Sequence, residues 1–165
     1  MSAKSMGVAQ MEVAARDYCR LIEQADGSVA EWLAQVAVQL PRLHAAVTSL
    51  DSGDGEAPAP RRTDLDRRFE LFSQLRELLG YRDGYWMEYD DPTSRQEMTG
   101  SLADDLTDIY FDVKQGLEWL DSRRPEQAAG VWRSGYRLHW GEHLVDAERQ
   151  LYHMVRREPR ALYRR

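Results

Sequence analysis

The sequence predicts an all-α, single-domain bundle of about five helices. Apolar residues recur three and four positions apart in several long stretches, whereas the alternation typical of β-strands is nearly absent. The 165 residues are enough for about one domain, and 42% hydrophobic with 30% charged residues is the composition of an ordinary globular protein. We therefore expect residues 1–165 to share one helical core.

The first half of the chain predicts two helices that pack along their length. The first ends near Gly27, and a capping box of Ser28 and Glu31 begins the second. Pro41 falls inside the second helix, but the apolar spacing continues in phase, so we expect a kink and not an end. The inward positions are Met11, Ala15, Tyr18 and Ile22, followed by Val29, Leu33, Val36, Leu40, Leu43, Val47 and Leu50.

A third helix follows a segment that has little to bury. Residues 51–62 are rich in Gly, Pro, Ser and Ala, which predicts a flexible linker within the domain. Thr63 with Asp66 predicts the start of the third helix, and Gly80 predicts its end. The residues expected to face inward are Leu65, Phe69, Phe72, Leu75, Leu78 and Leu79.

The segment between Tyr81 and Gly100 is irregular and rich in aromatic residues. Aromatic side chains in a connecting segment usually contribute buried area, so we expect a lid over a helix end. A wall of a ligand crevice is the alternative. The aromatic residues are Tyr81, Tyr85, Trp86 and Tyr89.

The last two stretches, 101–121 and 126–157, predict an antiparallel helical hairpin. The residues between them can reverse the chain but cannot separate the two helices. Both helices rise equally per residue, so residues whose numbers sum to about 247 lie at equal height. Asp108 then faces His139, and Asp105 faces His143. This pairing places carboxylates against imidazoles in the interior of the hairpin.

Other polar and aromatic residues flank this pairing. A narrow stripe of the last helix carries Trp132, Tyr136, His139, His143, Asp146 and Gln150. We expect Trp132 and Tyr136 to pack in the core with their polar tips satisfied. Asp104, three residues after Ser101, is expected to help start its helix, and Asp112 to be solvated. A candidate ligand or partner surface comprises Asp112, Trp132, Tyr136 and Asp146.

Three kinds of chemistry remain open for the facing residues. The simplest is a structural hydrogen-bonded network, because a buried histidine needs a partner for each ring nitrogen. The second is a divalent metal site formed by Asp105, Asp108, His139 and His143. The third is acid–base chemistry or ligand binding without a metal. Residues 139–143 match the inverted zincin pattern H-x-x-E-H, but only 22 residues follow, which leaves no room for that family's downstream acidic ligand.

Charge and cysteine content exclude several classes. The formal net charge of −6 argues against direct nucleic-acid binding, and no apolar stretch is long enough for a membrane span. Cys19 is the only cysteine, which is typical of a reducing compartment and favours a cytoplasmic location. Residues 158–165 form a basic tail.

Two motifs resemble the bacterial "domain of unknown function 5063" family. They are GSLADDLTDIYFD at 100–112 and HWGEHLVDA at 139–147, with weaker matches at 18–23 and at Leu40–Pro41. The resemblance implies a small helical bacterial protein of unassigned activity. It also implies that His139 and His143 belong to the family pattern and that Glu142 does not, which weakens a role for Glu142 as a base.

The sequence leaves open whether the protein is an enzyme. The leading hypothesis is a cytoplasmic binding or adaptor protein that docks a protein partner or small ligand beside the acidic hairpin. The alternative is a metal-dependent hydrolase acting on a phosphoester, in which His139, His143, Asp105 and Asp108 hold a divalent ion that activates water.

Overall fold

The computed structural model describes residues 3–50, 57–59, 62, 64–95 and 97–157. Its main elements, in chain order, are α1 (Ala3–Glu23), α2 (Val29–Thr48), α3 (Leu65–Leu79), β1 (Gly84–Tyr85), β2 (Gly100–Ser101), α4 (Leu102–Asp121), α5 (Pro125–Gly135) and α6 (Gly141–Arg157). A five-residue π turn, Tyr136–Trp140, joins α5 to α6. The helices of these residues form five rods, as predicted, because α5, the π turn and α6 follow one another without a break.

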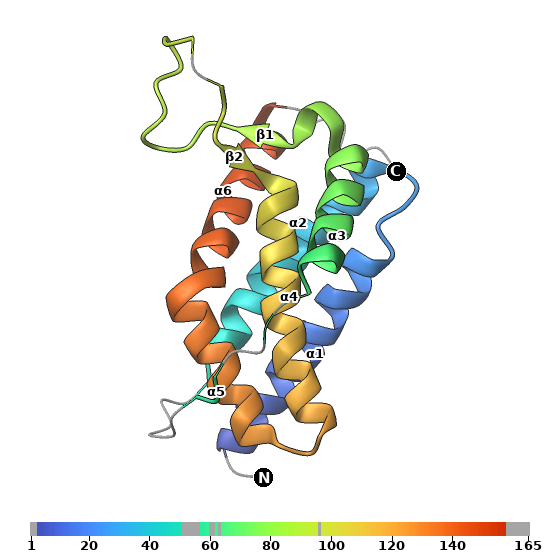
Figure 1. Cartoon of the computed structure of the whole chain (residues 1–165), viewed down its shortest axis with the longest axis vertical. Helices are drawn as coiled ribbons and strands as arrows, with labels where there is room; N and C mark the ends of the chain where they lie inside the picture. Colours follow the sequence, from blue (N-terminus) through green and yellow to red (C-terminus); the bar gives the residue numbers. More distant parts are fainter. Residues whose placement is uncertain (1–2, 51–56, 60–61, 63, 96, 158–165) are drawn as a thin grey trace.

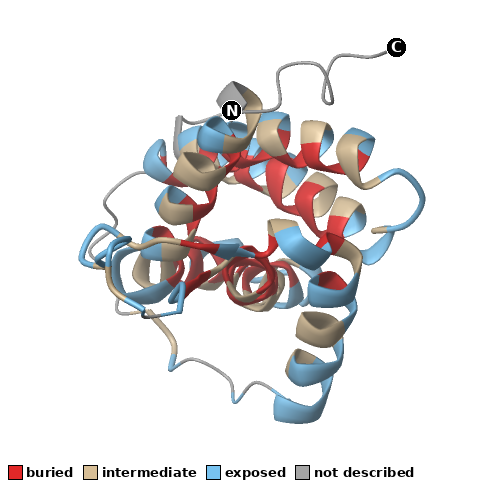
Figure 2. Ribbon diagram, turned by 90° about the horizontal axis from the view of Figure 1, so that it is seen from above, coloured by how far each residue is buried: buried red, intermediate tan, exposed pale blue. Residues whose placement is uncertain are grey.

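Helix α4 lies at the centre of the bundle. It contacts α1, α3, α5 and α6, and Figure 1 shows it between α3 and α6 with α1 and α2 behind. Seen from above, the buried residues line the inward sides of the helices (Figure 2). One hydrophobic cluster runs from Met11 on α1 to Leu151 on α6, so both halves of the described chain contribute to the same core.

The first two helices agree closely with the sequence. Ser28 caps α2 through its hydroxyl, which accepts a hydrogen bond from the backbone N–H of Glu31. Helix α2 continues through Pro41. The predicted seam is buried except at Val29, which is only partly covered. Because α2 packs against α1 and α6, its apolar stripe is covered over nearly the whole length.

Helix α3 corrects two predictions. Its cap is Asp64, whose side chain accepts hydrogen bonds from the N–H groups of Asp66 and Arg67; Thr63 lies outside the described residues. Leu65 and Phe69 are 74% and 68% exposed, although the spacing predicted that they face inward. Leu75 and Leu79 are buried as expected. Helix α3 packs mainly on α4, so only a narrow stripe of it is covered.

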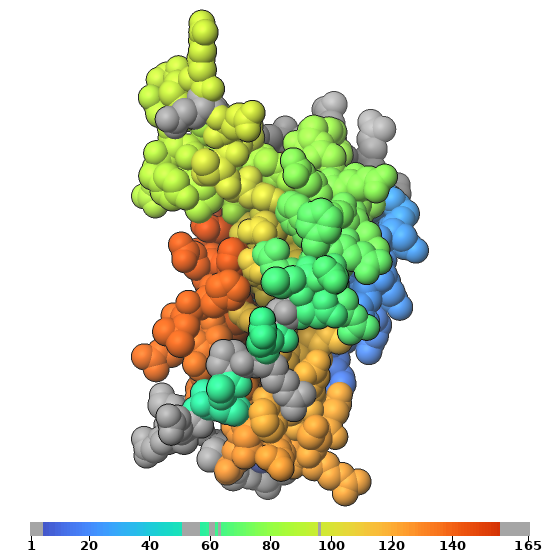
Figure 3. Space-filling view, viewed as in Figure 1, coloured from blue at the N-terminus to red at the C-terminus, as the bar shows by residue number. Residues whose placement is uncertain are grey.

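Strands β1 and β2 form an antiparallel pair at the start of α4, and the segment between them forms one end of the molecule (Figure 3). A Cβ on Gly100 would lie 2.3 Å from the ring of Tyr85, so only glycine lets that buried ring cross the strand. Tyr85 is buried and Trp86 is partly buried, whereas Tyr81 and Tyr89 are each 76% exposed. Only part of the aromatic segment therefore covers the helix end as predicted. Tyr85 and Trp86 pack there, and Tyr81 and Tyr89 face solvent.

Two segments predicted from the sequence lie largely or wholly outside the described residues. Most of the linker at 51–62 and the whole basic tail at 158–165 lie beyond the described residues. Of the linker, Ala57 and Pro58 approach Gly130 on α5. Among the helices of the described residues, none has the length and apolar character needed to cross a bilayer.

Candidate metal centre

The start of α4 is fixed by groups from outside the helix. Ser101 caps it by accepting a hydrogen bond from the N–H of Asp104. Asp83 accepts hydrogen bonds from the Ser101 hydroxyl and from the N–H of Ala103. A carboxylate at this position satisfies free backbone donors and suits the positive end of the helix dipole. The first turn of α4 is therefore held in place, and its aspartates are held with it.

Asp104 does not have the capping role that the sequence predicts for its side chain. Its carboxylate accepts a hydrogen bond of 2.9 Å from Arg68 Nη2, which extends from α3. Asp83, 18 residues before Ser101, instead occupies the acidic position at the helix start. The sequence could not reveal this, because the contact depends on how β1 pairs with β2.

The π turn shapes the opposite wall of the site. It spans Tyr136–Trp140, and His143 follows in the first turn of α6. A Cβ on Gly141 would lie 2.3 Å from the carbonyl oxygen of Tyr136, so this wide turn requires glycine there. Single π turns within α-helices occur frequently at functional sites. Here the turn brings the rings of His139 and His143 to 5.1 Å between centroids, at an interplanar angle of 75°.

His143 lies between two carboxylates of α4. Its Nδ1 is 2.8 Å from Asp105 Oδ1, and its Nε2 is 3.3 Å from Asp108 Oδ2. The side chains of Asp105 and Asp108 are only 6% and 11% exposed, and that of His143 is 24% exposed. The predicted pairing of Asp105 with His143 is therefore present, and Asp108 approaches the same ring.

His139 pairs one turn further along α4 than the sequence predicts. Its Nδ1 is 2.6 Å from Asp112 Oδ2, whereas the register argument placed Asp108 opposite it. The π turn adds a residue to one helical turn and so changes the register locally. A ligating atom of Asp108 still lies within 4.8 Å of one of His139. Asp112, expected to be solvated, is only 22% exposed because it packs under the half-exposed ring of His139.

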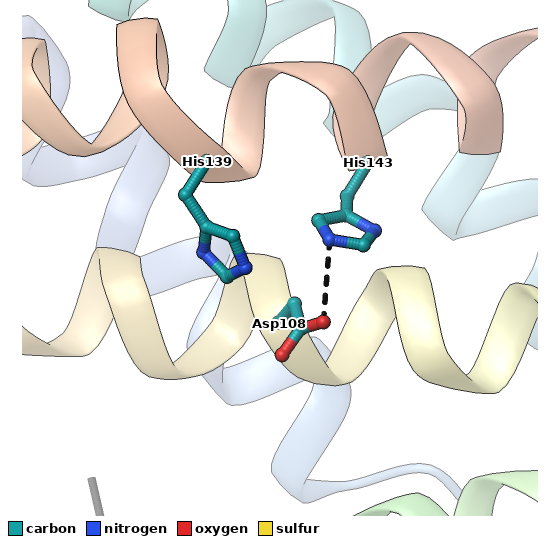
Figure 4. Close-up of side chains that lie close together, drawn as sticks. All are labelled: Asp108, His139 and His143. Atoms are coloured by element: carbon teal, nitrogen blue, oxygen red, sulfur yellow. Dashed lines mark ion pairs between the residues drawn. The ribbon is translucent and has the colours of Figure 1, made fainter.

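Three side chains bring ligating atoms close together. One atom each from Asp108, His139 and His143 lies within 4.8 Å of the other two. Figure 4 shows both rings extending toward α4, with a nitrogen of each turned toward the Asp108 carboxylate. Since Asp112 and Asp105 engage the Nδ1 atoms, Nε2 is the nitrogen that each ring can offer to a metal. Asp105, included in the predicted ligand set, instead supports His143 from behind.

Two further side chains hold the carboxylates in place. Arg68 donates from Nε to Asp108 Oδ1 at 2.8 Å, which leaves Oδ2 directed at His143. Tyr85 donates from its hydroxyl to Asp105 Oδ2 at 2.5 Å. The sequence analysis did not identify Arg68. Tyr85 carried a weak signal, since it belongs to the aromatic segment expected to cover a helix end.

Burial and hydrogen bonding set the charge states in opposite directions. The hydrogen bond with Asp105 raises the pKa of His143, although burial opposes the charged ring. Burial raises the pKa of Asp105, and hydrogen bonds from His143 and Tyr85 offset only part of that rise. Burial also raises the pKa of Asp112 despite the hydrogen bond with His139. The hydrogen bond thus favours the cationic form of His143, whereas burial disfavours the ionised forms of Asp105 and Asp112. A metal ion at Nε2 of His143 would therefore displace a proton.

The remaining candidate residues lie apart from this cluster. Trp132 is completely buried and donates from Nε1 to the Val113 carbonyl at 2.9 Å, so it cannot form part of a ligand surface. Its predicted packing role fits this position. Tyr136 turns toward α2, where its hydroxyl lies 2.8 Å from His44 Nε2. Asp146 pairs with Arg149 on α6. Glu142 is exposed.

The fold and this cluster define a small all-helical bundle with a histidine–aspartate site between its central and last rods. The sequence pattern described as "Domain of unknown function (DUF5063)" matches residues 4–157, and the chain belongs to this family. The resemblance noted in the sequence is thereby confirmed. The family description assigns no activity.

A solved structure has the same fold. The crystal structure of protein BF1032 from Bacteroides fragilis superposes with a TM-score of 0.71 at 22% sequence identity. The match covers 90% of this chain and 91% of that one. No curated protein matches the chain closely enough to count as a relative. At this identity the likeness establishes the helical architecture alone, and the chemistry depends on the residues of the site.

Proposed function

We propose that the protein is a metal-dependent hydrolase whose ion is held by Asp108, His139 and His143. The observation that carries this proposal is that the two nitrogens of each imidazole have different partners: Nδ1 engages a carboxylate, and Nε2 can bind a metal. Each Nδ1 is engaged by a carboxylate, Asp112 for His139 and Asp105 for His143. Metal-binding histidines typically donate their second N–H to a carboxylate in this way, which fixes the tautomer and makes the ligating nitrogen more basic.

The spacing of the ligating atoms suits a metal of ordinary size. Tetrahedral ligands with bonds of about 2.0–2.1 Å lie about 3.4 Å apart. His143 Nε2 and Asp108 Oδ2 already lie 3.3 Å apart. His139 is further away, but its side chain is 52% exposed and can close on an ion with little resistance from packing.

The open side of the site favours catalysis over a purely structural role. Structural zinc sites are closed by four protein ligands, whereas catalytic sites combine three with a water. The donor set of two histidines and one carboxylate leaves such a position, and the exposed ring of His139 places it at the surface. A metal-bound water there would have a pKa near 7 and would supply hydroxide at neutral pH.

An ion held by Asp108, His139 and His143 would supply the hydroxide for hydrolysis of a phosphoester. In that reaction the oxygen of water would be added to phosphorus, the bond to the ester oxygen would break, and the proton of that water would reach the leaving alkoxide through solvent. The side chains of this chain hold the ion and orient its ligands, with Arg68 fixing Asp108 and Tyr85 fixing Asp105.

The adaptor role has less support. It relied on the acidic surface of α4, yet Asp104 and Asp108 pair with Arg68, Asp105 with His143, and Asp112 with His139. Carboxylates that already engage partners in their own chain are less available to a basic partner. Docking of a partner beside the hairpin stays a prediction.

The test is metal content together with hydrolysis. Protein purified without chelator or histidine tag should contain about one transition-metal ion per chain and should hydrolyse p-nitrophenyl phosphate. His139→Ala combined with His143→Ala should lose both. His153→Ala is the matched control, because it removes an exposed histidine of α6 outside the site and should leave both unchanged. Equal metal content in the double variant would refute the site. Bound metal without turnover of any phosphoester would refute the hydrolase.

A further inference from the structure

A groove lies between α2 and α6, on the other side of the last rod from the histidine–aspartate site. Its volume is about 710 Å³, within the range of small-molecule sites. Its walls are mostly apolar, formed by Leu40 and Pro41 of α2 and by Leu151 and Val155 of α6 among others. Because such walls favour ligands with an apolar body, the polar groups of the groove decide which ligand is accepted.

His44 and Glu148 line this groove, and they form a chain of three polar side chains with Tyr136. His44 Nδ1 is 3.0 Å from Glu148 Oε2, and His44 Nε2 is 2.8 Å from the Tyr136 hydroxyl. A neutral His44 satisfies every partner, since Nδ1–H donates to the carboxylate and Nε2 accepts from the phenol. Glu148 is the only acidic residue among those that line the groove.

Pro41 adds a second acceptor. Proline has no backbone N–H, so the carbonyl of Ala37, four residues earlier, lacks its usual donor in the helix. Ala37 and Pro41 both line the groove. The groove therefore presents the Glu148 carboxylate against apolar walls, and it borders the turn of α2 in which the Ala37 carbonyl lacks its usual donor.

We infer that this groove binds a primary amine with an apolar body. A protonated amine offers three N–H donors and no acceptor, which complements the Glu148 carboxylate and the Ala37 carbonyl. Its alkyl or aryl part would cover the apolar walls. Repulsion from Glu148 disfavours a carboxylate ligand of the same shape. The inference does not depend on a metal at the other site.

The probe is n-octylammonium, titrated into isotopically labelled full-length protein and followed by amide chemical shifts. Octanoate and octanol, which share the apolar chain, are the comparison ligands. We expect octylammonium to shift amides of residues 37–48 and 148–155 and to bind at least about tenfold more tightly than either comparison ligand. Binding of octanoate or octanol with equal affinity would overturn the charge argument.

Variants localise the effect. Glu148→Gln keeps the shape and can still hydrogen-bond to His44, and it should weaken octylammonium binding about tenfold or more. Glu142→Gln, the same change at an exposed position of α6, should leave it unchanged. Ala45→Trp should fill the groove from an exposed position and abolish binding without altering its charge. Groove amides that do not move in the wild type would overturn the inference.

Discussion

Helix α4 meets two of its neighbours in different ways. Toward α1 the centre of the contact is apolar, because Tyr18 and Leu106 are completely buried and the Tyr18 hydroxyl donates to the Leu106 carbonyl. The ion pairs between these helices, Arg16 with Asp121 and Lys114 with Glu23, lie at its exposed edges. Toward α6, the polar face of the same helix places Asp105, Asp108 and Asp112 against two histidines. Apolar burial alone can hold two helices together. Buried charges cost desolvation and can often be replaced by apolar residues without loss of stability. The contrast indicates that the apolar contact between α1 and α4 maintains the fold, and that the aspartates facing α6 serve the chemistry of the site.

The largest predicted effect is on the rate at which a reagent alkylates Cys19, which measures how well the apolar side is protected from solvent. Cys19 is buried on α1, and burial raises the pKa of its thiol to about 12. At pH 8 the thiolate fraction is then about a thousandfold below that of an unperturbed cysteine. Alkylation by iodoacetamide should be slower by at least that factor in native protein than in urea, as measured by mass spectrometry. Rapid labelling of native protein would show that this side opens readily.

The next largest effect is the loss of stability when a buried apolar side chain is truncated. Ile109→Ala removes a completely buried side chain and should lower the free energy of unfolding by about 2–5 kcal/mol, because it leaves a cavity. Urea denaturation measures this directly. Val38→Ala is the control, since Val38 is 54% exposed and the change should cost less than about 0.5 kcal/mol. Similar costs at both positions would contradict the assignment of the core.

Metal loading should then stabilise the polar side. A free ion at 100 times its dissociation constant adds about 2.7 kcal/mol to the native state. For a chain of this size that raises Tm by roughly 5–10 °C. Calorimetry with zinc or cobalt should show the rise in the wild type and none in the His139→Ala, His143→Ala double variant. An equal rise in both proteins would place the ion elsewhere.

The smallest effects separate the two histidines in metal-free protein. His143→Ala leaves Asp105 and Asp108 without their shared partner and should cost about 1–3 kcal/mol. His139→Ala removes a half-exposed ring and should cost less than about 1 kcal/mol. Both variants should lose the metal-induced rise in Tm. If His139→Ala retained the full rise, His139 would not be a ligand.

Periodicity was sufficient to predict the helices and the pairing of Asp105 with His143. Apolar spacing identified the covered side of α1 and α2, although Leu65 and Phe69 of α3 are exposed against the same kind of prediction. A short connection fixes the register of a hairpin to within a turn. The exact partner of His139 could not be derived, because the π turn changes the register locally and nothing in the spacing announces it. Arg68 and Asp83 were missed for a different reason. Their contacts with α4 depend on how α3 and the short strands pack, which a single sequence does not specify.

The most direct test is a crystal of the protein grown with zinc, measured at the zinc absorption edge. The account predicts one anomalous peak about 2.0–2.2 Å from Asp108 Oδ2 and from the Nε2 atoms of His139 and His143. Asp105 and Asp112 should stay on the Nδ1 atoms. A saturated crystal with no peak between α4 and α6, or with zinc bound only by other residues, would contradict the central claim.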